Sequence, residues 1–353
     1  MITLAINLLR WNSPWEEIRA CMEAILQSNF QDFELIYMEN FNPDCSSLIA
    51  QVRQTFGGDP RLRIVSTGSN LGYAGGHNRF FAENDAELLM VLNPDAILDR
   101  GFLKAIVRPF SDPKVAAATG KMLKPIPTSS GERILDGTGI VLSRSRRGRE
   151  RGQLEIDRQQ YDNEPRVFGV SGTAAVYRKS ALEAVRLGRS EYFDIDFFAY
   201  WEDLDLSWRL RLFGYECVYV PEAVVEHCRA AGSSKDGILN LPEFIRHNRS
   251  FPRKVRQWSW RNHLFAIIKN DYGWNFYRDL PWIAARELAM LVFAACFVPD
   301  TLLAFPEFLR LLPKMLSKRR YIMKHLKSTA RTHDAFFYAA TPVQDAPVGR
   351  RGH

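Results

Sequence analysis

The chain has 353 residues, enough for a sizeable buried core, and this length favours one large domain or one domain with an appendage. Hydrophobic residues make up 46% of the chain and charged residues 25%, a composition that excludes the intrinsically disordered class. The formal net charge of +7 admits nucleic acid, anionic lipid or phosphorylated substrates as partners.

The cysteines and the first residues bear on the cellular compartment. Met1 leads directly into an apolar, strand-like run, without the basic and apolar segments of a signal peptide. The five cysteines show no paired CxxC spacing, so we expect neither a disulfide framework nor a structural zinc site; they are Cys21, Cys45, Cys217, Cys228 and Cys296. We therefore expect a cytoplasmic protein.

The first hundred residues alternate short apolar runs with helical stretches. We expect strands at 2–9, 34–39, 62–66 and 88–92. We expect helices at 15–27, 45–56 and 75–83. Strands separated by helices of this length predict a Rossmann-like α/β fold with a mostly parallel central sheet, whose ligands lie at the carboxyl ends of the strands.

The middle of the chain begins with a polar stretch at 131–165, whose one short apolar run lies at 140–142. We expect an extended surface loop with a small hairpin there. Order should resume at 167–177, followed by helices at 179–187 and 203–213 and a strand at 216–220. Gly214 should end the second of these helices.

After about Pro242 the sequence becomes Trp-rich, basic and helical, with apolar stretches at 288–298 and 301–312. Eleven apolar residues are too few to span a bilayer, and Asp300 and Glu307 interrupt any longer span. A helical hairpin packed on the rest of the protein is one interpretation. We favour an interfacial membrane anchor whose basic segment 314–331 lies on anionic headgroups. The basic segments lack interleaved aromatic residues, so we expect no nucleic-acid partner.

The first candidate site stretch is Asn93-Pro94-Asp95, directly after the apolar run 88–92. A carboxylate at the end of a central strand lies in the ligand crevice of an α/β sheet, where it can bind a divalent cation that bridges phosphates. Taken alone, Asp95 is better explained as a turn or helix-capping residue.

The second stretch is 70–78, which contains three glycines and precedes a helix. Gly72, Gly75 and Gly76 would permit close backbone approach to a ligand, and the amide groups of the helix could face phosphate. The stretch lacks the GxGxxG and GK[ST] patterns, so it indicates a nucleotide neighbourhood without naming the nucleotide. A structural tight turn explains the glycines equally well.

The third stretch, 193–209, brings carboxylates beside aromatic residues at the start of a helix; the carboxylates are Glu202, Asp203 and Asp205. Helix capping explains one of them, and an apolar wall suits a carboxylate that accepts a proton. His227 follows a second strand of the sheet and could complete a metal shell with Asp95. A single histidine is more often a surface or core residue.

In this order, the motifs resemble those of glycosyltransferase family 2, and within it the bacterial rhamnosyltransferase-like branch. The resemblance runs from Ile2 to Ser234. Its elements are residues 7–12, Glu39-Asn40, 70–78, 93–95, 171–174, Trp201-Glu202-Asp203, and His227 with Gly232-Ser233. It implies the GT-A fold of nucleotide-diphosphosugar transferases over residues 1–240, with a nucleotide-sugar half at about 1–100 and an acceptor half at about 101–240. A membrane-associated helical region at 241–330 and a flexible tail at 331–353 would follow.

The resemblance also implies roles for single residues. Asp95 and His227 would hold Mg²⁺ or Mn²⁺, and Asp203, with Glu202 beside it, would be the general base. The nucleotide sugar would meet Asn12, Glu39, Asn70, Gly72, Gly75, Gly76, Asn78 and Asn93, and the acceptor would meet Gly172, Thr173 and Trp201. Two features depart from the family pattern: Glu39 replaces the usual aspartate, and Asn-Pro-Asp leaves Asp95 as the only acid of the metal motif.

The resemblance implies an inverting transfer of a sugar to a hydroxyl group of a cell-envelope or lipid-linked glycan. The branch indicates dTDP-L-rhamnose as the donor, with UDP-galactofuranose or UDP-N-acetylglucosamine as alternatives. A peripheral location on the cytoplasmic face of the membrane follows, and a homo-oligomer is left open. We expect the arginine-rich segment 144–151 to be solvated, with the acceptor's phosphates as an alternative contact.

Two other classes of protein share parts of this pattern. A nucleotide-binding oxidoreductase would need the GxGxxG pattern after its first strand, and residues 8–12 lack it. A non-catalytic scaffold of a polysaccharide assembly complex would keep the fold and lose the acids, whereas Asp95, Glu202, Asp203 and His227 are all present.

Overall fold

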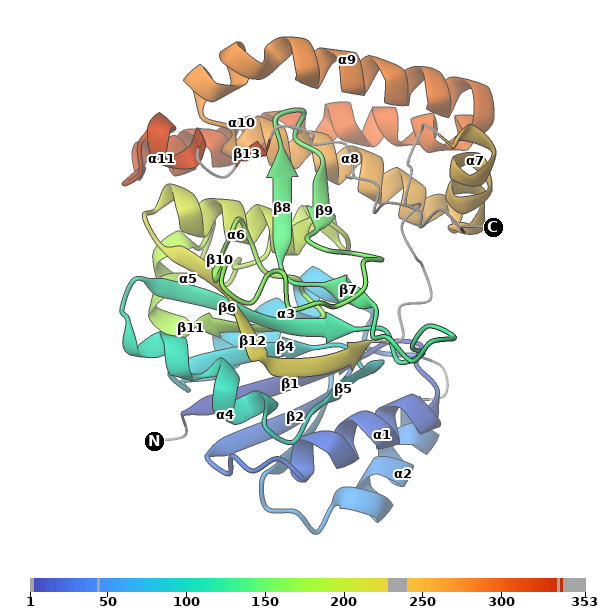
Figure 1. Ribbon diagram of the computed structural model, residues 1–353, viewed down its shortest axis with the longest axis vertical. Helices are drawn as coiled ribbons and strands as arrows, with labels where there is room; N and C mark the ends of the chain where they lie inside the picture. Colours follow the sequence, from blue (N-terminus) through green and yellow to red (C-terminus); the bar gives the residue numbers. More distant parts are fainter. Residues whose placement is uncertain (1–2, 43–44, 228–239, 335–336, 339–353) are drawn as a thin grey trace, which may run out of the picture.

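The computed structural model describes residues 3–42, 45–227, 240–334 and 337–338. Its centre is a ten-stranded sheet of β1 (Leu4–Arg10), β2 (Phe33–Glu39), β3 (Leu62–Ser66), β4 (Leu88–Leu92), β5 (Ala96–Leu98), β6 (Val115–Leu123), β7 (Leu135–Gly137), β10 (Arg166–Val167), β11 (Ala174–Arg178) and β12 (Glu216–His227). The strand order is β10-β12-β6-β11-β4-β1-β2-β3, with β5 beside β12 and β7 beside β6 (Figure 1). Strands β1 to β4 run parallel, as do β6 and β12, and β11 joins the two groups antiparallel.

Helices cover both faces of this sheet. One face carries α1 (Trp15–Leu26), α2 (Cys45–Phe56) and α4 (Phe102–Ile106), the last followed by the short η1 (Arg108–Ser111). The other carries α3 (Gly72–Glu83), α5 (Lys179–Val185), η2 (Ile195–Phe197) and α6 (Glu202–Leu212). The predicted α/β fold with a mostly parallel sheet is confirmed, and each strand and helix expected in the first hundred residues is present.

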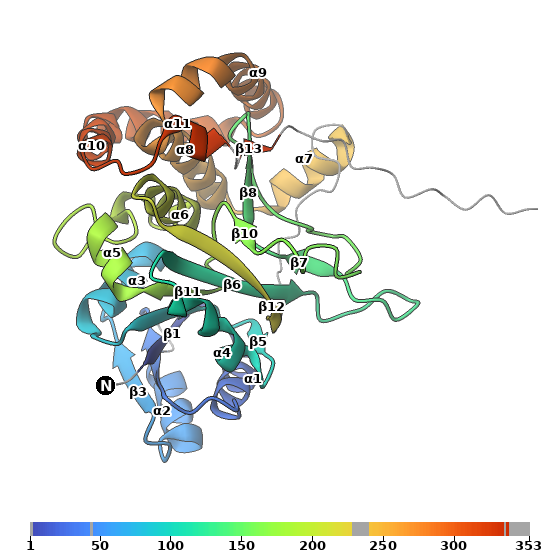
Figure 2. The same ribbon diagram turned by 60° about the vertical axis from the view of Figure 1, so that its left-hand side comes forward.

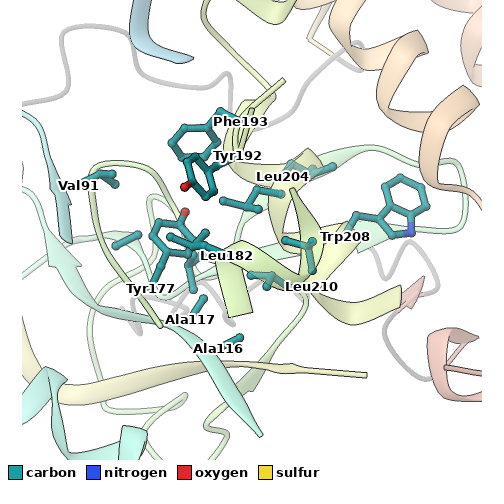
Figure 3. Packing of buried hydrophobic residues seen from close by; sticks show 14 of the residues in the cluster. Val91, Ala116, Ala117, Tyr177, Leu182, Tyr192, Phe193, Leu204, Trp208 and Leu210 are labelled. Carbon is teal, nitrogen blue, oxygen red and sulfur yellow. The ribbon is translucent and has the colours of Figure 1, made fainter. Parts of the chain in front are cut away.

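The core follows from the strand sequences. Strand β4 reads LLMVL and is buried along its whole length, as expected for a central strand covered on both faces. On the α6 side, Tyr177, Phe193, Leu204 and Trp208 pack together between the sheet and the helices (Figure 3). Full burial of one such side chain contributes about 1.5–3 kcal/mol relative to exposure, so this layer fixes α6 firmly on the sheet.

The C-terminal helices form a further layer over α6 (Figures 1 and 2). They are α7 (Leu241–Ser250), α8 (Arg253–Asn270), α9 (Gly273–Phe297), η4 (Pro299–Ala304), α10 (Phe305–Lys324) and α11 (Ala330–Asp334). Phe265 of α8 and Met315 of α10 are fully buried in the same hydrophobic cluster as α6. The helical layer is therefore part of the packed structure, and a domain boundary at 240/241 stays a prediction.

The segment 131–165 differs from the expected surface loop. It contains the expected hairpin, formed by β8 (Ile140–Ser143) and β9 (Gly148–Glu150), which rises from the sheet towards the C-terminal helices (Figure 1). Arg146 at its turn is fully buried and pairs with Asp271 at 2.8 Å and Asp279 at 2.9 Å. Because the charge of Arg146 is paired inside the protein, the expectation of a solvated loop was wrong for this arginine.

The expected flexible tail 331–353 is in part ordered. Strand β13 (Phe337–Tyr338) pairs parallel with β8, and the Arg146 guanidinium lies 4.0 Å from the centre of the Phe337 ring. The remainder of the tail, at 335–336 and 339–353, lies outside the described residues, as do Cys228 and the Gly232-Ser233 motif.

The basic segment 314–331 was expected to face membrane headgroups, but one of its lysines is buried instead. Lys318 of α10 is buried, and its Nζ lies 2.5 Å from both Glu191 and Asp194 and 2.8 Å from Asp196. Lys314 pairs with Asp196 as well. These ion pairs hold α10 against the segment that contains Glu191, Asp194 and Asp196.

The apolar stretch 288–298 lies at the end of a longer helix. Helix α9 begins at Gly273 and carries Pro281 in its interior. By length and composition it could cross a membrane, the one such helix in the described part of the chain, and 17% of its apolar window is buried.

Candidate active site

Asp95 and His227 meet at the carboxyl end of β4. Strand β12 does not end at Val220 as expected; it continues to His227 after an irregularity at Val220/Val224, where Pro221 supplies no N–H to the ladder. The extension pairs His227 with Ala96 of β5, directly after Asp95. As a result, Nε2 of His227 lies 3.3 Å from Oδ2 of Asp95.

This spacing fits a shared divalent cation. Two ligand atoms that each lie about 2.1 Å from one ion are roughly 3.0–3.4 Å apart in octahedral or tetrahedral geometry. Nδ1 of His227 faces Oδ2 of the fully buried Asp136 at 2.8 Å. If Nδ1 carries the proton and donates it to this carboxylate, Nε2 keeps its lone pair for a metal. Asp136 lies on β7, inside the segment expected to be a surface loop, and no local sequence pattern marks it.

Asp203 lies at the first turn of α6, where two backbone amides hold its carboxylate. Oδ2 accepts a hydrogen bond from the Gly172 amide at 2.9 Å, and Oδ1 accepts one from Leu204 at 2.7 Å. The neighbouring Glu202 is almost completely buried. Burial, together with the charge of Asp203, holds the pKa of the Glu202 carboxyl well above its usual range. Of these two acids, Asp203 is therefore the one suited to accept a proton.

A short series of hydrogen bonds to backbone groups connects the end of β4, where Asp95 lies, with Asp203. The amide of Asn93 donates to the carbonyl of Thr173 at 2.9 Å, and the next residue back, Gly172, donates to Asp203. The Gly172 carbonyl accepts a hydrogen bond from the Tyr73 hydroxyl at 2.5 Å. A methyl group on Gly172 would lie 2.6 Å from that hydroxyl, so a side chain here would displace Tyr73 from its hydrogen bond.

The backbone turns sharply just before the Glu-Asp pair. Phe198, Tyr200 and Trp201 all have positive φ angles, a conformation that costs non-glycine residues energy and persists where the surroundings enforce it. The enforcing group is the side chain of Asn262 on α8. Its Nδ2 lies 2.9–3.0 Å from the carbonyl oxygens of residues 197, 199 and 200. Sequence inspection gave no sign of this role.

A pocket of about 210 Å³ adjoins the turn on the side of the C-terminal helices. Tyr200 and Trp201 form one wall, and residues of α7, α8, α9 and η4 form the others. The Trp201 ring lies 4.5 Å from the ring of His263, and its Nε1 donates to Ser259 at 3.3 Å. Burial, with the charge of Arg286, lowers the pKa of His263 to about 4. Trp201, which was predicted to lie on the acceptor side, thus lines a cavity.

The predicted nucleotide-sugar residues at the other end of the site are less exposed than expected. Glu39 is 0% exposed; Oε1 accepts a hydrogen bond from Arg10 at 2.9 Å and Oε2 accepts one from Tyr37 at 2.6 Å. Its carboxylate is thus engaged inside the protein, and nucleobase contact stays a prediction. Asn12 and Asn70 are exposed at the same edge of the sheet.

The glycines of 70–78 are required by packing against the protein itself. Gly72 has a φ of +69°, and a methyl group there would lie 2.6 Å from the carbonyl of Phe198. Methyl groups on Gly75 and Gly76 would meet Leu71 and Leu9, respectively. The interpretation that they open the backbone to a ligand has no support in these contacts. Asn78 is also engaged internally, because Nδ2 donates to Phe193 at 2.8 Å.

Another acidic cluster has the spacing of a metal site. Glu191, Asp194 and Asp196 bring carboxylate oxygens within 4.8 Å of one another. Lys318 donates to all three, and Lys269 pairs with Asp194, so lysines already neutralise the cluster. Asp205 is likewise structural, because it pairs with Lys269 at 2.8 Å and Arg209 at 3.2 Å.

Comparison with known proteins decides the family. The model described as "Glycosyl transferase family 2" matches residues 10–186, half of the chain. The chain belongs to glycosyltransferase family 2. The match includes Asp95, Asp136 and Gly172 and ends before α6.

Curated relatives of this family-2 chain include two kinds of transferase. It is 29% identical over 201 residues to N-acetylglucosaminyl-diphospho-decaprenol L-rhamnosyltransferase of Mycobacterium tuberculosis, an alignment that covers 52% of this chain and 64% of that protein. It is 24% identical over 218 residues to poly-beta-1,6-N-acetyl-D-glucosamine synthase of Staphylococcus epidermidis, which covers 62% and 48%. The chain thus spans about half to two thirds of these relatives.

Solved structures bear out the GT-A fold. The S. aureus TarS fragment 1-349 matches with a TM-score of 0.54 and 13% identity, over 91% of this chain and 87% of that one. A mannosyltransferase of Pyrobaculum calidifontis, solved with GDP-Man and Mn2+, matches with a TM-score of 0.50 and 16% identity, over 92% and 85%. At these identities the likeness concerns the fold alone.

Proposed function

We propose that this family-2 enzyme transfers L-rhamnose from dTDP-L-rhamnose to a hydroxyl group of a glycan carried on a lipid diphosphate. The observation that carries the proposal is the site geometry: Asp95 and His227 stand at metal-ligand spacing, and residues 172–173 join them to Asp203. The mycobacterial relative, a rhamnosyltransferase by its printed name, supports this choice of donor and acceptor.

In this reaction, Asp203 accepts the proton of the acceptor hydroxyl. The hydroxyl oxygen forms a bond to the anomeric carbon while the bond from that carbon to the nucleoside diphosphate breaks, so the configuration inverts. The amides of Gly172 and Leu204 keep the carboxylate oriented. General-base assistance of this kind contributes about 10²- to 10⁴-fold.

Asp95 and His227 would hold the divalent cation, Mg²⁺ or Mn²⁺, and Asp136 would orient the imidazole. A bound cation supplies charge neutralisation to the departing diphosphate. Burial and the charge of Asp203 raise the pKa of Glu202, which disfavours a second negative charge beside the base.

We place the enzyme at the cytoplasmic face of a membrane, on which the C-terminal layer lies. Helix α9 exposes apolar side chains along much of its length: Trp274, Tyr277, Leu280, Trp282, Leu288, Leu291 and Val292. Helix α10 and η4 add Leu303, Phe305, Leu309 and Leu316. Exposed apolar area on this scale is typical of an interaction surface rather than of a solvated helix.

Titration calorimetry of the purified protein with dTDP and with UDP, each with and without Mn²⁺, tests the proposal. We expect metal-dependent binding of dTDP. Metal-dependent binding of UDP alone would favour a UDP-sugar donor, such as UDP-galactofuranose or UDP-N-acetylglucosamine. Binding of neither nucleotide would contradict a transferase and favour a non-catalytic scaffold.

A further inference from the structure

The tip of the β8–β9 hairpin touches the residues that flank the Glu-Asp pair. A methyl group built on Gly148 would stand 2.5 Å from a methyl carbon of Leu204 and 3.4 Å from the Trp201 ring. The backbone of the hairpin therefore lies directly on the start of α6. The neighbours of Gly148 therefore lie beside Trp201, which forms one wall of the pocket.

Those neighbours are Arg147 and Arg149. Four arginines of the segment 144–151 fall into two kinds. Arg146 and Arg151 are buried with internal partners, whereas Arg147 and Arg149 are exposed. Within the described ranges, no acidic group lies at ion-pair distance from either exposed guanidinium. Two unpaired guanidinium groups next to a transfer site are suited to a phosphorylated ligand.

A third guanidinium faces them from α9. Partial burial and the like charges of Arg286 and Arg149 lower the pKa of Arg147, so Arg147 stands close enough to each of these two cations to be repelled by it. Arg286 donates to His263 at 2.6 Å and pairs with Glu287. One carboxylate against three guanidinium groups leaves an excess of two positive charges, and a bound diphosphate would offset it.

The same Arg286 lines the pocket beside Trp201. Most of the remaining lining is apolar: Phe251, Val255, Trp260, Met290, Phe293, Ala294 and Val298. Three kinds of group therefore meet around Trp201: the carboxylate of Asp203, a group of cations, and an apolar pocket. Together they match the chemistry of a sugar, a diphosphate and a hydrocarbon chain joined in one molecule.

We propose that Arg147, Arg149 and Arg286 bind the diphosphate of a lipid-linked acceptor, and that the pocket beside Trp201 takes the start of its hydrocarbon chain. The proposal rests on the proposed function for the sugar end of that molecule. It adds the location of the acceptor's lipid-diphosphate portion and names the residues that recognise it. Anionic headgroups alone would account for the arginines and would leave the pocket without an occupant.

Binding of farnesyl diphosphate to the full chain, without nucleotide, tests the site; tryptophan fluorescence can report it because Trp201 and Trp260 line the pocket. Replacing Arg147→Gln together with Arg149→Gln should weaken binding at least roughly tenfold. The matched control, Arg53→Gln with Arg158→Gln, removes two exposed arginines elsewhere and should bind within about twofold of the wild type.

Three further binding measurements distinguish recognition of the diphosphate from recognition of the hydrocarbon chain. Ala294→Trp fills the pocket, so it should weaken farnesyl diphosphate and leave inorganic pyrophosphate unchanged. Farnesol should bind the arginine variant as it binds the wild type. Vesicles of anionic lipid report headgroup binding: if they compete with farnesyl diphosphate fully and Ala294→Trp has no effect, the site is a headgroup contact and the proposal fails.

The proposal also fails if the arginine variant binds farnesyl diphosphate as tightly as the wild type. Failure of the proposed function is a separate result, because it is read from nucleotide titration in the absence of lipid. If the protein binds dTDP with Mn²⁺ but does not bind farnesyl diphosphate, the proposed function stands and the proposed lipid-diphosphate site does not.

Discussion

The carboxylate of Asp136 lies 2.8 Å from Nδ1 of His227 and so favours Nε2 as the ring nitrogen that faces Asp95. Asp136→Asn keeps the shape and removes the negative charge that favours the Nδ1–H tautomer. Loss of such a partner costs about 10- to 100-fold in metal affinity, and we expect a fall of that size for Mn²⁺. Titration of Mn²⁺ followed by electron paramagnetic resonance measures it.

Asp162→Asn is the control, because Asp162 comes from the same polar segment and pairs with Lys121 at 3.0 Å instead. It should bind Mn²⁺ as the wild type does. Unchanged Mn²⁺ affinity in Asp136→Asn would show that His227 does not depend on this carboxylate.

Asp203→Asn and Glu202→Gln form a second, contrasting pair. In the first variant, a side-chain amide replaces the carboxylate and cannot accept the acceptor's proton, so we expect turnover to fall about 10²- to 10⁴-fold while dTDP binding is retained. Burial and the charge of Asp203 raise the pKa of Glu202 and so favour its protonated form, which glutamine resembles; this variant should therefore cost much less activity. Initial rates with saturating donor compare the two. Equal losses would mean that Asp203 is not the base.

Much of the fold was predictable because its signals are local. Strand β4 is apolar throughout and the helices before it are amphipathic, so order and type follow from periodicity alone. Asp95 was singled out as a candidate because it comes just after that strand, and the resemblance to the family supplied its metal-binding role.

The roles that were missed depend on contacts distant in sequence. Asp136 and His227 are 91 residues apart, and nothing around Asp136 marks it as a partner. The strand was expected to end at Val220, yet β12 bulges there and continues to His227. Glycine stands at position 72 because Phe198 packs directly against it, and no local sequence pattern links these two residues.

Asn262→Ala tests whether α8 positions the base. The variant loses the amide that holds residues 197–200 in their strained turn, so Asp203 should be presented less accurately. We expect kcat to fall at least roughly tenfold at unchanged KM for the donor, and the free energy of unfolding to fall by about 1–3 kcal/mol. Asn275→Ala is the matched control, because Asn275 is equally buried and donates to the carbonyl of Ala330 at 3.0 Å. It should lose stability and keep kcat; equal loss of kcat in both would reduce Asn262 to a general stabilising role.

The apolar face of α9 makes a prediction about membranes. Leu288 and Val292 are 62% and 54% exposed and stand one helical turn apart. Leu288→Glu with Val292→Glu should weaken co-sedimentation with phosphatidylglycerol vesicles at least roughly tenfold, because two apolar side chains would no longer enter the interface. Ile126→Glu alters a side chain that is 78% exposed on the sheet side and should leave vesicle binding unchanged. Vesicle binding that survives in the double variant would contradict the proposed membrane face.

His77 makes a prediction about pH. It is fully buried on α3, its Nδ1 lies 2.9 Å from the Asn7 amide, and burial lowers its pKa to about 3. Because the unfolded chain takes up this proton near pH 6.5 and the folded protein does not, stability contributed by the neutral ring is complete above pH 6.5. It is lost as the pH falls towards 3, by up to about 1.4 kcal/mol per pH unit. Urea unfolding at several pH values between 7 and 4.5 should therefore show a shallower pH dependence for His77→Gln than for the wild type. The variant will be less stable at pH 7, so the comparison rests on the slopes, and parallel slopes would mean that His77 is protonated in the folded protein.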